Sequence, residues 1–281
     1  MKEDQPSQKL YEKDIMANPK TGAHGYLTTH FANRSREQQS QGWSELWESG
    51  QTDFWDRGKP SPALIDFIES ATLPRRDGRR LRVLVPGCGK GYDVAMLALH
   101  GFDVCGLEVS ERGAEVAREF TTSQLSNPSE LNFGSKYTHS MTGCVQIIAG
   151  DFFKRDWEKL CFEGDTTGFD IIYDYTFLCA LLPVMRKDWA HRMSELLAPD
   201  GILVCLEFPL YKDLNDIGPP WGLSGVHWNI LARGEDGIIS EPGEQGEPLN
   251  GKFKRTSYFK PPRSYESGRG TDMVSVWMLK K

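Results

Sequence analysis

Val83-Leu-Val-Pro-Gly-Cys-Gly-Lys-Gly91 is the stretch of sequence that decides the fold. Its apolar beginning belongs to a run that starts at Leu81, and this run predicts a buried strand ending at Pro86. Gly87, Gly89 and Gly91 follow, and the next residues predict an apolar helix over 92–99. Glycines between a strand and a helix let the backbone turn sharply and approach a ligand closely.

An acidic residue follows this loop at the end of the next predicted strand. Glu108 lies 21 positions after Gly87, at the end of the next predicted strand. An acid in that place can accept hydrogen bonds from the ribose hydroxyls of a bound nucleoside. The same residues would also suit a tight turn beside a surface glutamate, because a glycine motif alone is a weak indicator of binding.

The spacing of the glycines narrows the choice of ligand. A dinucleotide fingerprint needs Gly-x-Gly-x-x-Gly, whereas this loop has Gly-x-Gly-x-Gly, which disfavours a dehydrogenase. A phosphate-binding loop needs Ser or Thr after Gly-Lys, but Lys90 is followed by Gly91. A ligand with a ribose and no pyrophosphate fits better. We therefore predict S-adenosylmethionine as the cofactor and S-adenosylhomocysteine as its product.

Strands and helices alternate through most of the chain. The predicted strands are 81–86, 103–108, 145–149, 169–173 and 202–208, and the predicted helices are 62–71, 92–99, 111–123 and 185–197. This alternation is typical of an α/β fold with a doubly wound parallel sheet. The segments 253–259 and 273–279 could pair as a final hairpin.

The chain divides into a polar beginning and one large domain. Residues 1–40 contain few large aliphatic side chains, and we expect them to be largely disordered, with a partly ordered stretch near Gly25 to Phe31. Residues 41–281 are predicted to form a single domain. The stretches 123–144 and 234–252 are predicted surface loops, and with the N-terminal extension they are where a protein partner could bind.

Composition excludes several classes of protein. The chain has 281 residues and a formal net charge of −6, which argues against a broad nucleic-acid surface. No apolar run approaches the roughly 20 residues that span a bilayer, and the polar N-terminus lacks a secretory signal. The six cysteines are scattered and several lie in apolar runs, so we expect free thiols and a cytoplasmic protein. No residues have the spacing of metal ligands, so no metal is expected.

Seven segments resemble the thiopurine/thiol methyltransferase family, in particular its thiol- and halide-methylating branch in plants and fungi. The resemblance implies a class I methyltransferase fold, with a mostly parallel, seven-stranded, Rossmann-like sheet and an antiparallel C-terminal strand. The matching segments are Trp43-Ser-Glu-Leu-Trp47, Trp55-Asp-Arg-Gly58, Leu84-Val-Pro-Gly-Cys-Gly-Lys-Gly-Tyr-Asp93, Gly106-Leu-Glu108, Gly150-Asp-Phe-Phe153, Phe169-Asp-Ile-Ile-Tyr-Asp-Tyr-Thr-Phe177 and Gly218-Pro-Pro-Trp221.

The resemblance also implies roles for individual residues. Residues 41–58 would form an aromatic lid over the cofactor, since a tryptophan pair one helical turn apart can face one ligand. Without the resemblance, such a pair is more often part of a hydrophobic core. The residues implied to bind the cofactor are Trp43, Trp47, Phe54, Gly87, Gly89, Glu108, Asp151, Phe152 and Asp174.

Two further residues are implied to lie beside the methyl acceptor. Tyr175 follows the fourth predicted strand, and Trp221 stands where plant members tend to have tyrosine. No histidine or lysine is placed by a motif as a general base, which favours an acceptor that ionises by itself, such as a small thiol. Two alternatives stay open, an O- or N-methyltransferase of a secondary metabolite and a methyltransferase-like regulatory subunit in a protein complex.

Overall fold

The computed structural model describes residues 19–138, 140–162, 167–239, 249–268 and 270–281. Seven strands form one sheet in the order β3-β2-β1-β4-β5-β7-β6. All neighbouring strands pair in parallel except β7, which is antiparallel to both β5 and β6. The predicted fold, including its antiparallel C-terminal strand, is therefore confirmed. The strands are β1 (Arg82–Pro86), β2 (Asp103–Glu108), β3 (Val145–Ala149), β4 (Phe169–Asp174), β5 (Leu197–Glu207), β6 (Phe253–Phe259) and β7 (Met273–Leu279).

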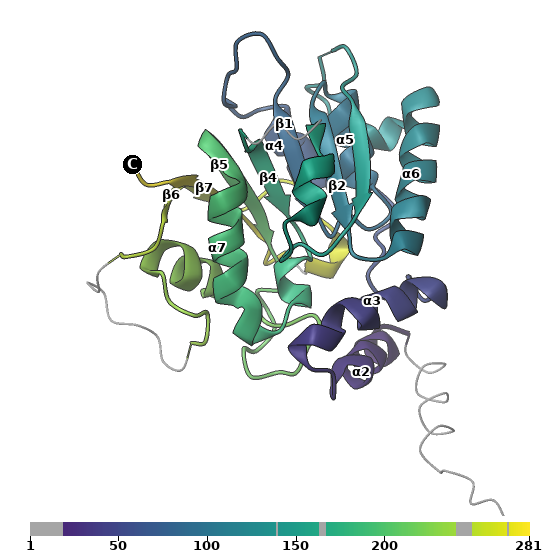
Figure 1. Ribbon diagram of the computed structural model, residues 1–281, viewed down its shortest axis with the longest axis vertical. Coiled ribbons are helices and arrows are strands. Elements are labelled where there is room, and N and C mark those ends of the chain that lie inside the picture. Colours follow the sequence, from purple (N-terminus) through teal and green to yellow (C-terminus); the bar gives the residue numbers. More distant parts are fainter. Residues whose placement is uncertain (1–18, 139, 163–166, 240–248, 269) are drawn as a thin grey trace, which may run out of the picture.

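Helices surround the sheet (Figure 1). The α-helices are α2 (Pro19–Phe31), α3 (Gln39–Glu48), α4 (Pro62–Ile68), α5 (Tyr92–Leu99), α6 (Glu111–Ser126) and α7 (Arg186–Leu196), with a π-helical segment, η7 (Trp228–Arg233). Short 3-10 turns are η1 (Arg36–Gln38), η2 (Glu130–Asn132), η3 (Asp156–Leu160), η5 (Leu178–Ala180), η6 (Pro183–Met185) and η8 (Glu266–Gly268). In the part of the chain described, no helix is both long and apolar enough to cross a membrane.

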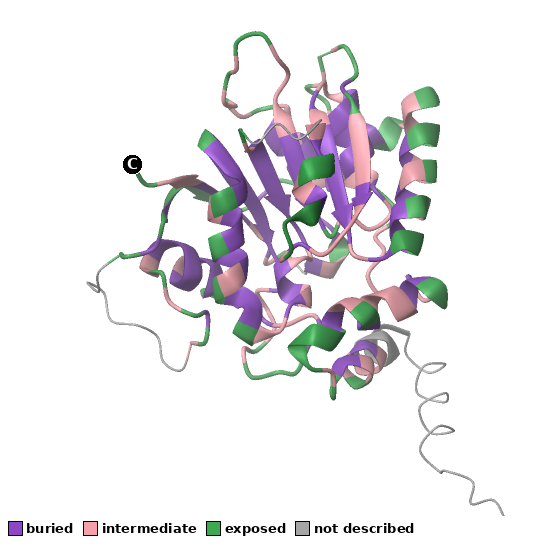
Figure 2. Cartoon of the chain, in the orientation of Figure 1, coloured by how far each residue is buried: buried purple, intermediate pink, exposed green. Residues whose placement is uncertain are grey.

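The core lies along the central strands β1 and β4, which are buried throughout except for the partly exposed Arg82 at the start of β1 (Figure 2). Val83 and Leu84 of β1 and Ile171 and Ile172 of β4 have no exposed surface. Parallel strands covered on both faces are expected to be continuously apolar, and this is why the run before the glycine loop was recognisable as a strand. The end of β1 therefore holds the glycine loop on a rigid support.

A charged cluster fixes the start of β4 to the segment that precedes β1. The Asp170 carboxylate is fully buried and accepts hydrogen bonds from Arg76 Nε at 2.6 Å and Arg79 Nη1 at 2.6 Å. It also accepts one from the backbone N–H of Arg82 at 2.9 Å. These donors hold the pKa of Asp170 below its usual range, although burial by itself would raise it.

Helices occupy part of the N-terminal region. Residues 19–40 contain α2, η1 and the start of α3, and α2 includes the stretch near Gly25 to Phe31 that was expected to be partly ordered. Residues 1–18 lie outside the described part. Leu27 and Phe31, one turn apart on α2, pack with Leu46 of α3 in a small hydrophobic cluster. Two large apolar residues are enough to hold α2 in place because Leu46 of α3 supplies the remaining apolar contact. A contact from another helix cannot be recognised in the local composition. α2 and α3 lie together at one end of the sheet (Figure 1).

Candidate cofactor and acceptor sites

The glycine loop after β1 has the conformation that its sequence suggests. Gly87, Gly89 and Gly91 all have positive φ, at 60°, 56° and 81°, a region that favours glycine. A side-chain carbon on Gly87 would lie 2.6 Å from the Phe177 ring. A carbon on Gly89 would meet no atom within 4 Å. The loop is therefore packed on one side and leaves its backbone open to a ligand on the other.

Glu108 lies at the end of β2 beside this open backbone. Its Oε2 accepts a hydrogen bond from Gly89 N at 3.1 Å, and its Oε1 accepts one from Val109 N at 3.0 Å. Burial raises the pKa of the Glu108 carboxyl to about 7, while the hydrogen bonds from Ser110, Gly89, Val109 and Trp47 oppose this shift. A carboxylate buried in this way has lost much of its water, so ligand hydroxyls that reach it would be bound strongly.

A cavity of about 530 Å³ opens between α3 and the carboxyl ends of β1, β2 and β4. The predicted cofactor residues that line it are Trp43, Trp47, Gly87, Gly89, Glu108, Asp151 and Phe152. They come from four separate stretches of the chain, and open α/β sheets bind their ligands at this edge. The fold thus brings together most of the predicted cofactor site.

Three tryptophans cover this cavity. The indole of Trp55 meets those of Trp43 and Trp47 edge to face, with ring centroids 5.4 and 5.8 Å away. Trp43 also packs on Phe31, which belongs to the α2–α3 cluster. The tryptophans therefore belong to a packed unit that α2 supports through Phe31.

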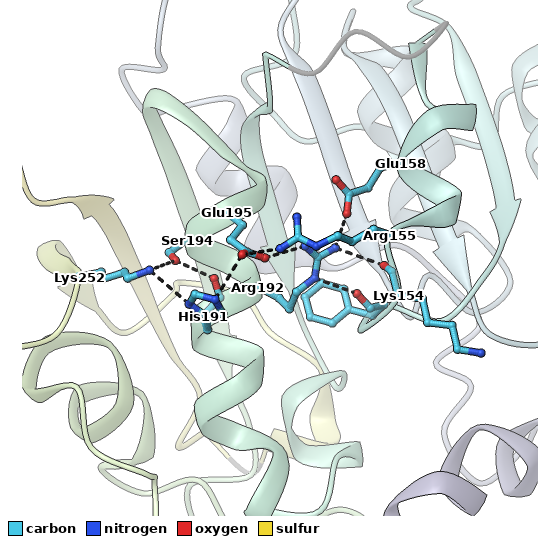
Figure 3. A network of polar contacts seen from close by, with 9 residues as sticks. Lys154, Arg155, Glu158, His191, Arg192, Ser194, Glu195 and Lys252 are labelled. Atoms are coloured by element: carbon cyan, nitrogen blue, oxygen red, sulfur yellow. Dashed lines mark hydrogen bonds and ion pairs between the residues drawn. The ribbon is translucent and has the colours of Figure 1, made fainter.

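A polar network around Arg192 joins α7 to the segment after β3 (Figure 3). The buried Arg192 on α7 donates from Nε to the carbonyl oxygen of Phe152 at 3.3 Å, and its guanidinium lies 5.9 Å from the Phe152 ring centroid. The same guanidinium donates to Glu158 at 2.6 Å and to Glu195 at 2.8 Å. Because Arg192 is fixed from several sides, it can orient the backbone that carries Phe152.

Asp151 has two kinds of contact. It lines the cavity, yet its Oδ1 also accepts a hydrogen bond from Phe153 N at 2.9 Å. Its Oδ2 lies 3.5 Å from the Ser40 hydroxyl of α3, which connects the turn after β3 with the lid.

Two predicted cofactor residues lie away from the cavity lining. Phe54 stacks on Tyr26 of α2 with ring centroids 4.9 Å apart, and it packs against the α2–α3 cluster. Asp174 is buried and accepts hydrogen bonds from Leu178 N at 3.3 Å and Trp189 Nε1 at 3.0 Å. Burial raises the pKa of Asp174 to about 7. The structure places both residues where they support the site from behind.

A second, smaller cavity of about 70 Å³ adjoins the first, and the two share Trp55, Gly87, Gly89 and Thr176 in their linings. Thr176 has φ of +59°, which is strained for a β-branched residue. Tyr175 lines the smaller cavity and stacks on Tyr265 with ring centroids 5.0 Å apart. Burial raises the pKa of the Tyr175 phenol to about 12, although Arg57 opposes this shift. Tyr175 therefore stays protonated and can act as a hydrogen-bond donor at neutral pH.

Trp221 does not share this position. It lines neither cavity, its backbone N–H donates to Cys179 O at 2.8 Å, and its ring lies against Gly218. Of the two residues that the resemblance placed beside the acceptor, Tyr175 lines the smaller cavity and Trp221 lines neither of the two cavities described.

Several lining residues were not predicted to belong to a site. Arg57 and Tyr265 line the smaller cavity, and Phe177 lines the larger one. Arg57 and Phe177 belong to segments that carry the family resemblance, so they could have been predicted as site residues from their neighbours in those segments. Tyr265 comes from a loop before β7 that no motif marked.

The residues present fit S-adenosylmethionine. Glu108 could hold the ribose hydroxyls, the open backbone at Gly89 leaves room for close approach, and the rings of Trp43, Trp47 and Phe152 provide apolar walls. A cavity of about 530 Å³ is within the usual range for sites that bind small molecules and cofactors.

Comparisons with known proteins agree with this geometry. The model of the thiopurine S-methyltransferase (TPMT) family matches residues 38–233. A probable thiol methyltransferase 2 of Arabidopsis thaliana is 39% identical over 232 residues, covering 79% of this chain and 88% of that protein. Thiocyanate methyltransferase 1 of Brassica oleracea is 32% identical over 236 residues, 84% of each chain.

The fold also recurs among solved structures. The 1,6-didemethyltoxoflavin-N1-methyltransferase of Burkholderia thailandensis superimposes with a TM-score of 0.52 at 15% identity, covering 88% of this chain and 92% of that one. With the family match over residues 38–233 and the cofactor cavity in place, the chain belongs to the thiopurine S-methyltransferase family and is an S-adenosylmethionine-dependent methyltransferase.

Proposed function

We propose that the enzyme transfers the methyl group to the sulfur of a small thiol held in the smaller cavity. The observation that carries this proposal is the junction of the two cavities at Trp55, Gly87, Gly89 and Thr176. A cofactor in the larger cavity and an acceptor in the smaller one would meet there. The relatives named as thiol and thiocyanate methyltransferases support a sulfur acceptor.

The roles of the lining residues follow from this arrangement. S-adenosylmethionine, when bound, supplies an electrophilic methyl group on a sulfonium sulfur. Glu108 would bind the ribose, and Trp43 and Trp47 would cover the cofactor as part of the lid, 41–58. Aromatic rings beside a sulfonium also attract its positive charge. The chain would mainly provide proximity and alignment, which can lower a barrier by about 7–11 kcal/mol in well-oriented systems.

The acceptor does not need a dedicated base on the protein. Among the described residues, no histidine lines either cavity. Asp56 is engaged by Lys90 at 2.5 Å, and Asp93 accepts a hydrogen bond from Ser61 N at 2.7 Å. A thiol with a pKa near 8.5 supplies some thiolate at neutral pH without help.

A direct test is a screen of tritiated-methyl transfer to small thiols, thiocyanate, iodide and phenols, followed by pH–rate profiles with thiols of different acidity. We expect activity with thiols and a kcat/KM that rises with pH until the pKa of each free thiol is passed. One fixed pKa for every acceptor would indicate an enzyme base, and it would favour the oxygen or nitrogen alternative.

We further propose that the protein works in the cytoplasm, because its six cysteines are all free thiols. A protein partner at residues 1–40 or at the loops 123–144 and 234–252 remains a separate proposal. Residues 1–18, 139 and 240–248 lie outside the described part. Fractionation of cells and co-purification with full-length protein would test both proposals, and a secreted protein that purifies alone would contradict them.

A further inference from the structure

Arg57 is a partly buried cation with spare hydrogen-bonding capacity beside the smaller cavity. Its Nε donates to Tyr175 Oη at 3.3 Å, and its guanidinium lies 5.5 Å from the ring centroid of Phe208. Within the described residues, Arg57 forms no ion pair with a carboxylate and uses neither of its terminal nitrogens as a hydrogen-bond donor. An arginine head group carries five donors, so most of them are available to a ligand.

Three of the other charged side chains that line this cavity, Lys90, Asp56 and Asp93, have partners within the protein. Lys90 pairs with Asp56, whose Oδ2 also accepts a hydrogen bond from Tyr92 Oη at 3.3 Å. Asp93 is held by Ser61 N. Asp56 is thus paired with a cation, whereas burial raises the pKa of the Asp93 carboxyl to about 6 and the hydrogen bond from Ser61 N opposes this shift.

The remaining titratable groups in or near the cavity are neutral or more distant. Burial raises the pKa of the Cys88 thiol and of the phenols of Tyr173 and Tyr265, so all three stay protonated. Asp272 lies near enough to be attracted by Arg57, yet it forms no ion pair within the described residues. Lys59 lines the cavity with a side chain that is exposed.

An unpartnered hydroxyl is a second and independent indication of a ligand. Tyr173 lines the smaller cavity and is only 2% exposed. Its Oη forms no hydrogen bond of ordinary geometry among the described residues, although the Ser61 side chain is near enough to lower the pKa of the phenol against the effect of burial. A buried hydroxyl without a partner costs free energy unless a ligand or water satisfies it. With Tyr175, which contacts Arg57, it offers a second neutral hydroxyl to the smaller cavity.

We propose that Arg57 determines acceptor specificity by charge, so that the smaller cavity binds a compact anionic sulfur nucleophile and holds it as the anion. This inference rests on the proposed function. The cavity volume of about 70 Å³ limits the acceptor to a few heavy atoms. The terminal nitrogens of Arg57 and the phenol of Tyr175 supply the donors that such an anion needs in place of water.

The chemical step balances with these groups. The thiol first releases its proton to solvent, and Arg57 stabilises the thiolate that remains. A lone pair of the thiolate sulfur forms the new S–CH₃ bond while the bond from the methyl carbon to the sulfonium sulfur breaks. The electrons of that bond stay on the departing sulfur, which becomes the thioether of S-adenosylhomocysteine. Arg57 exchanges no proton and acts by position and charge alone.

The test compares wild type with Arg57→Met, Arg57→Lys and Lys59→Met. Thiocyanate binding to protein saturated with S-adenosylhomocysteine is measured by calorimetry, which needs no turnover. We expect Arg57→Met to weaken thiocyanate binding about tenfold or more, and Arg57→Lys to recover part of the loss. Lys59→Met should lose less than about threefold, because its exposed charge is screened by solvent.

The pH profile of kcat provides a readout that a purely structural role would not change. We expect the apparent pKa of a bound thiol to rise by about one unit in Arg57→Met, because an adjacent cation favours the ionised form. The affinity of each variant for S-adenosylhomocysteine shows that the site is folded.

Equal losses in Lys59→Met and Arg57→Met would overturn the assignment to Arg57, as would an unchanged kcat profile in a variant that still binds S-adenosylhomocysteine. If wild type methylated no thiol and no thiocyanate, the proposed function itself would fail. Calorimetry would then still report whether Arg57 binds the anion.

Discussion

Gly113 on α6 and Trp47 on α3 are in direct contact, since a side-chain carbon on Gly113 would lie 2.7 Å from Cε2 of the Trp47 indole. The same carbon would lie 2.8 Å from Cγ of Glu108. Three elements of the cofactor site, α3, β2 and α6, therefore meet at one residue that must be small. The lid can approach the carboxylate only because this helical position carries no side chain.

Gly113→Ala should weaken binding of S-adenosylhomocysteine by about five- to tenfold, because the added methyl group displaces either Trp47 or Glu108. Alanine also favours the helical state by about 1 kcal/mol over glycine, which offsets part of any loss of stability. Calorimetry and thermal unfolding would separate the two effects. Ser123→Ala, at an exposed position on the same helix, is the matched control, and an equal affinity change there would contradict the prediction.

Cofactor affinity should depend on the ionisation of Glu108. A buried carboxyl whose folded pKa is raised to about 7 contributes stability below its unfolded pKa, and that contribution is lost as pH rises through about 7. Ribose hydroxyls donate best to the ionised form. Binding of S-adenosylhomocysteine should therefore strengthen and release a proton between pH 6 and pH 8. Calorimetry in buffers of different ionisation enthalpy would measure this release.

The matched variant for this experiment is Glu108→Gln, which keeps the shape of the side chain and removes its titration. We expect weaker binding by roughly 1.5–3 kcal/mol and a flat pH dependence. If wild-type affinity did not change over this pH range, the ribose contact would not depend on the carboxylate.

Arg192→Met should loosen the wall formed by Phe152. The variant loses hydrogen bonds to the Phe152 carbonyl and to Glu158 and Glu195, so we expect a loss in the free energy of unfolding of about 2–3 kcal/mol. Affinity for S-adenosylhomocysteine should fall as well. Arg155→Met is the control, since the Arg155 side chain is 65% exposed and should contribute less than about 1 kcal/mol.

Asp170→Asn should destabilise the sheet by about 3 kcal/mol, because it leaves Arg76 and Arg79 beside a neutral amide. The pKa of Asp170 is lowered in the folded state, so its stabilising effect is present above the unfolded value and is lost as pH falls through the lowered one. Urea unfolding between pH 6 and pH 3 should show a steeper loss of stability in wild type than in the variant. Parallel curves would contradict this account.

Local patterns were sufficient to predict the frame of the molecule. Each predicted strand is present, and the predicted helix 111–123 lies within α6, which Ser110 caps by accepting a hydrogen bond from Gly113 N. The glycine loop and Glu108 were predictable because close backbone approach and ribose binding demand specific residue types at fixed distances.

What could not be predicted depends on contacts between distant segments. α2 is stabilised by Leu46 and neighbouring aromatic residues, so its own composition predicted only a partly ordered stretch near Gly25 to Phe31 and not a helix. Asp174 follows a strand at the ligand edge, yet its carboxylate is bound by Trp189 from α7. Arg57 shows its significance only when Tyr175, which lies 118 positions later, comes within hydrogen-bond distance.

The small α2–α3 cluster is separate from the main core, and this separation bears on how the enzyme releases its product. Leu27, Phe31 and Leu46 can part from the sheet without exposing the residues that hold β1 and β4 together. Local opening with a low free energy is then available to the lid while the sheet stays intact. Amide hydrogens of α2 and α3 should therefore exchange faster than those of β4, and bound S-adenosylhomocysteine should slow their exchange. Local opening of these two short helices would then limit the rate of turnover.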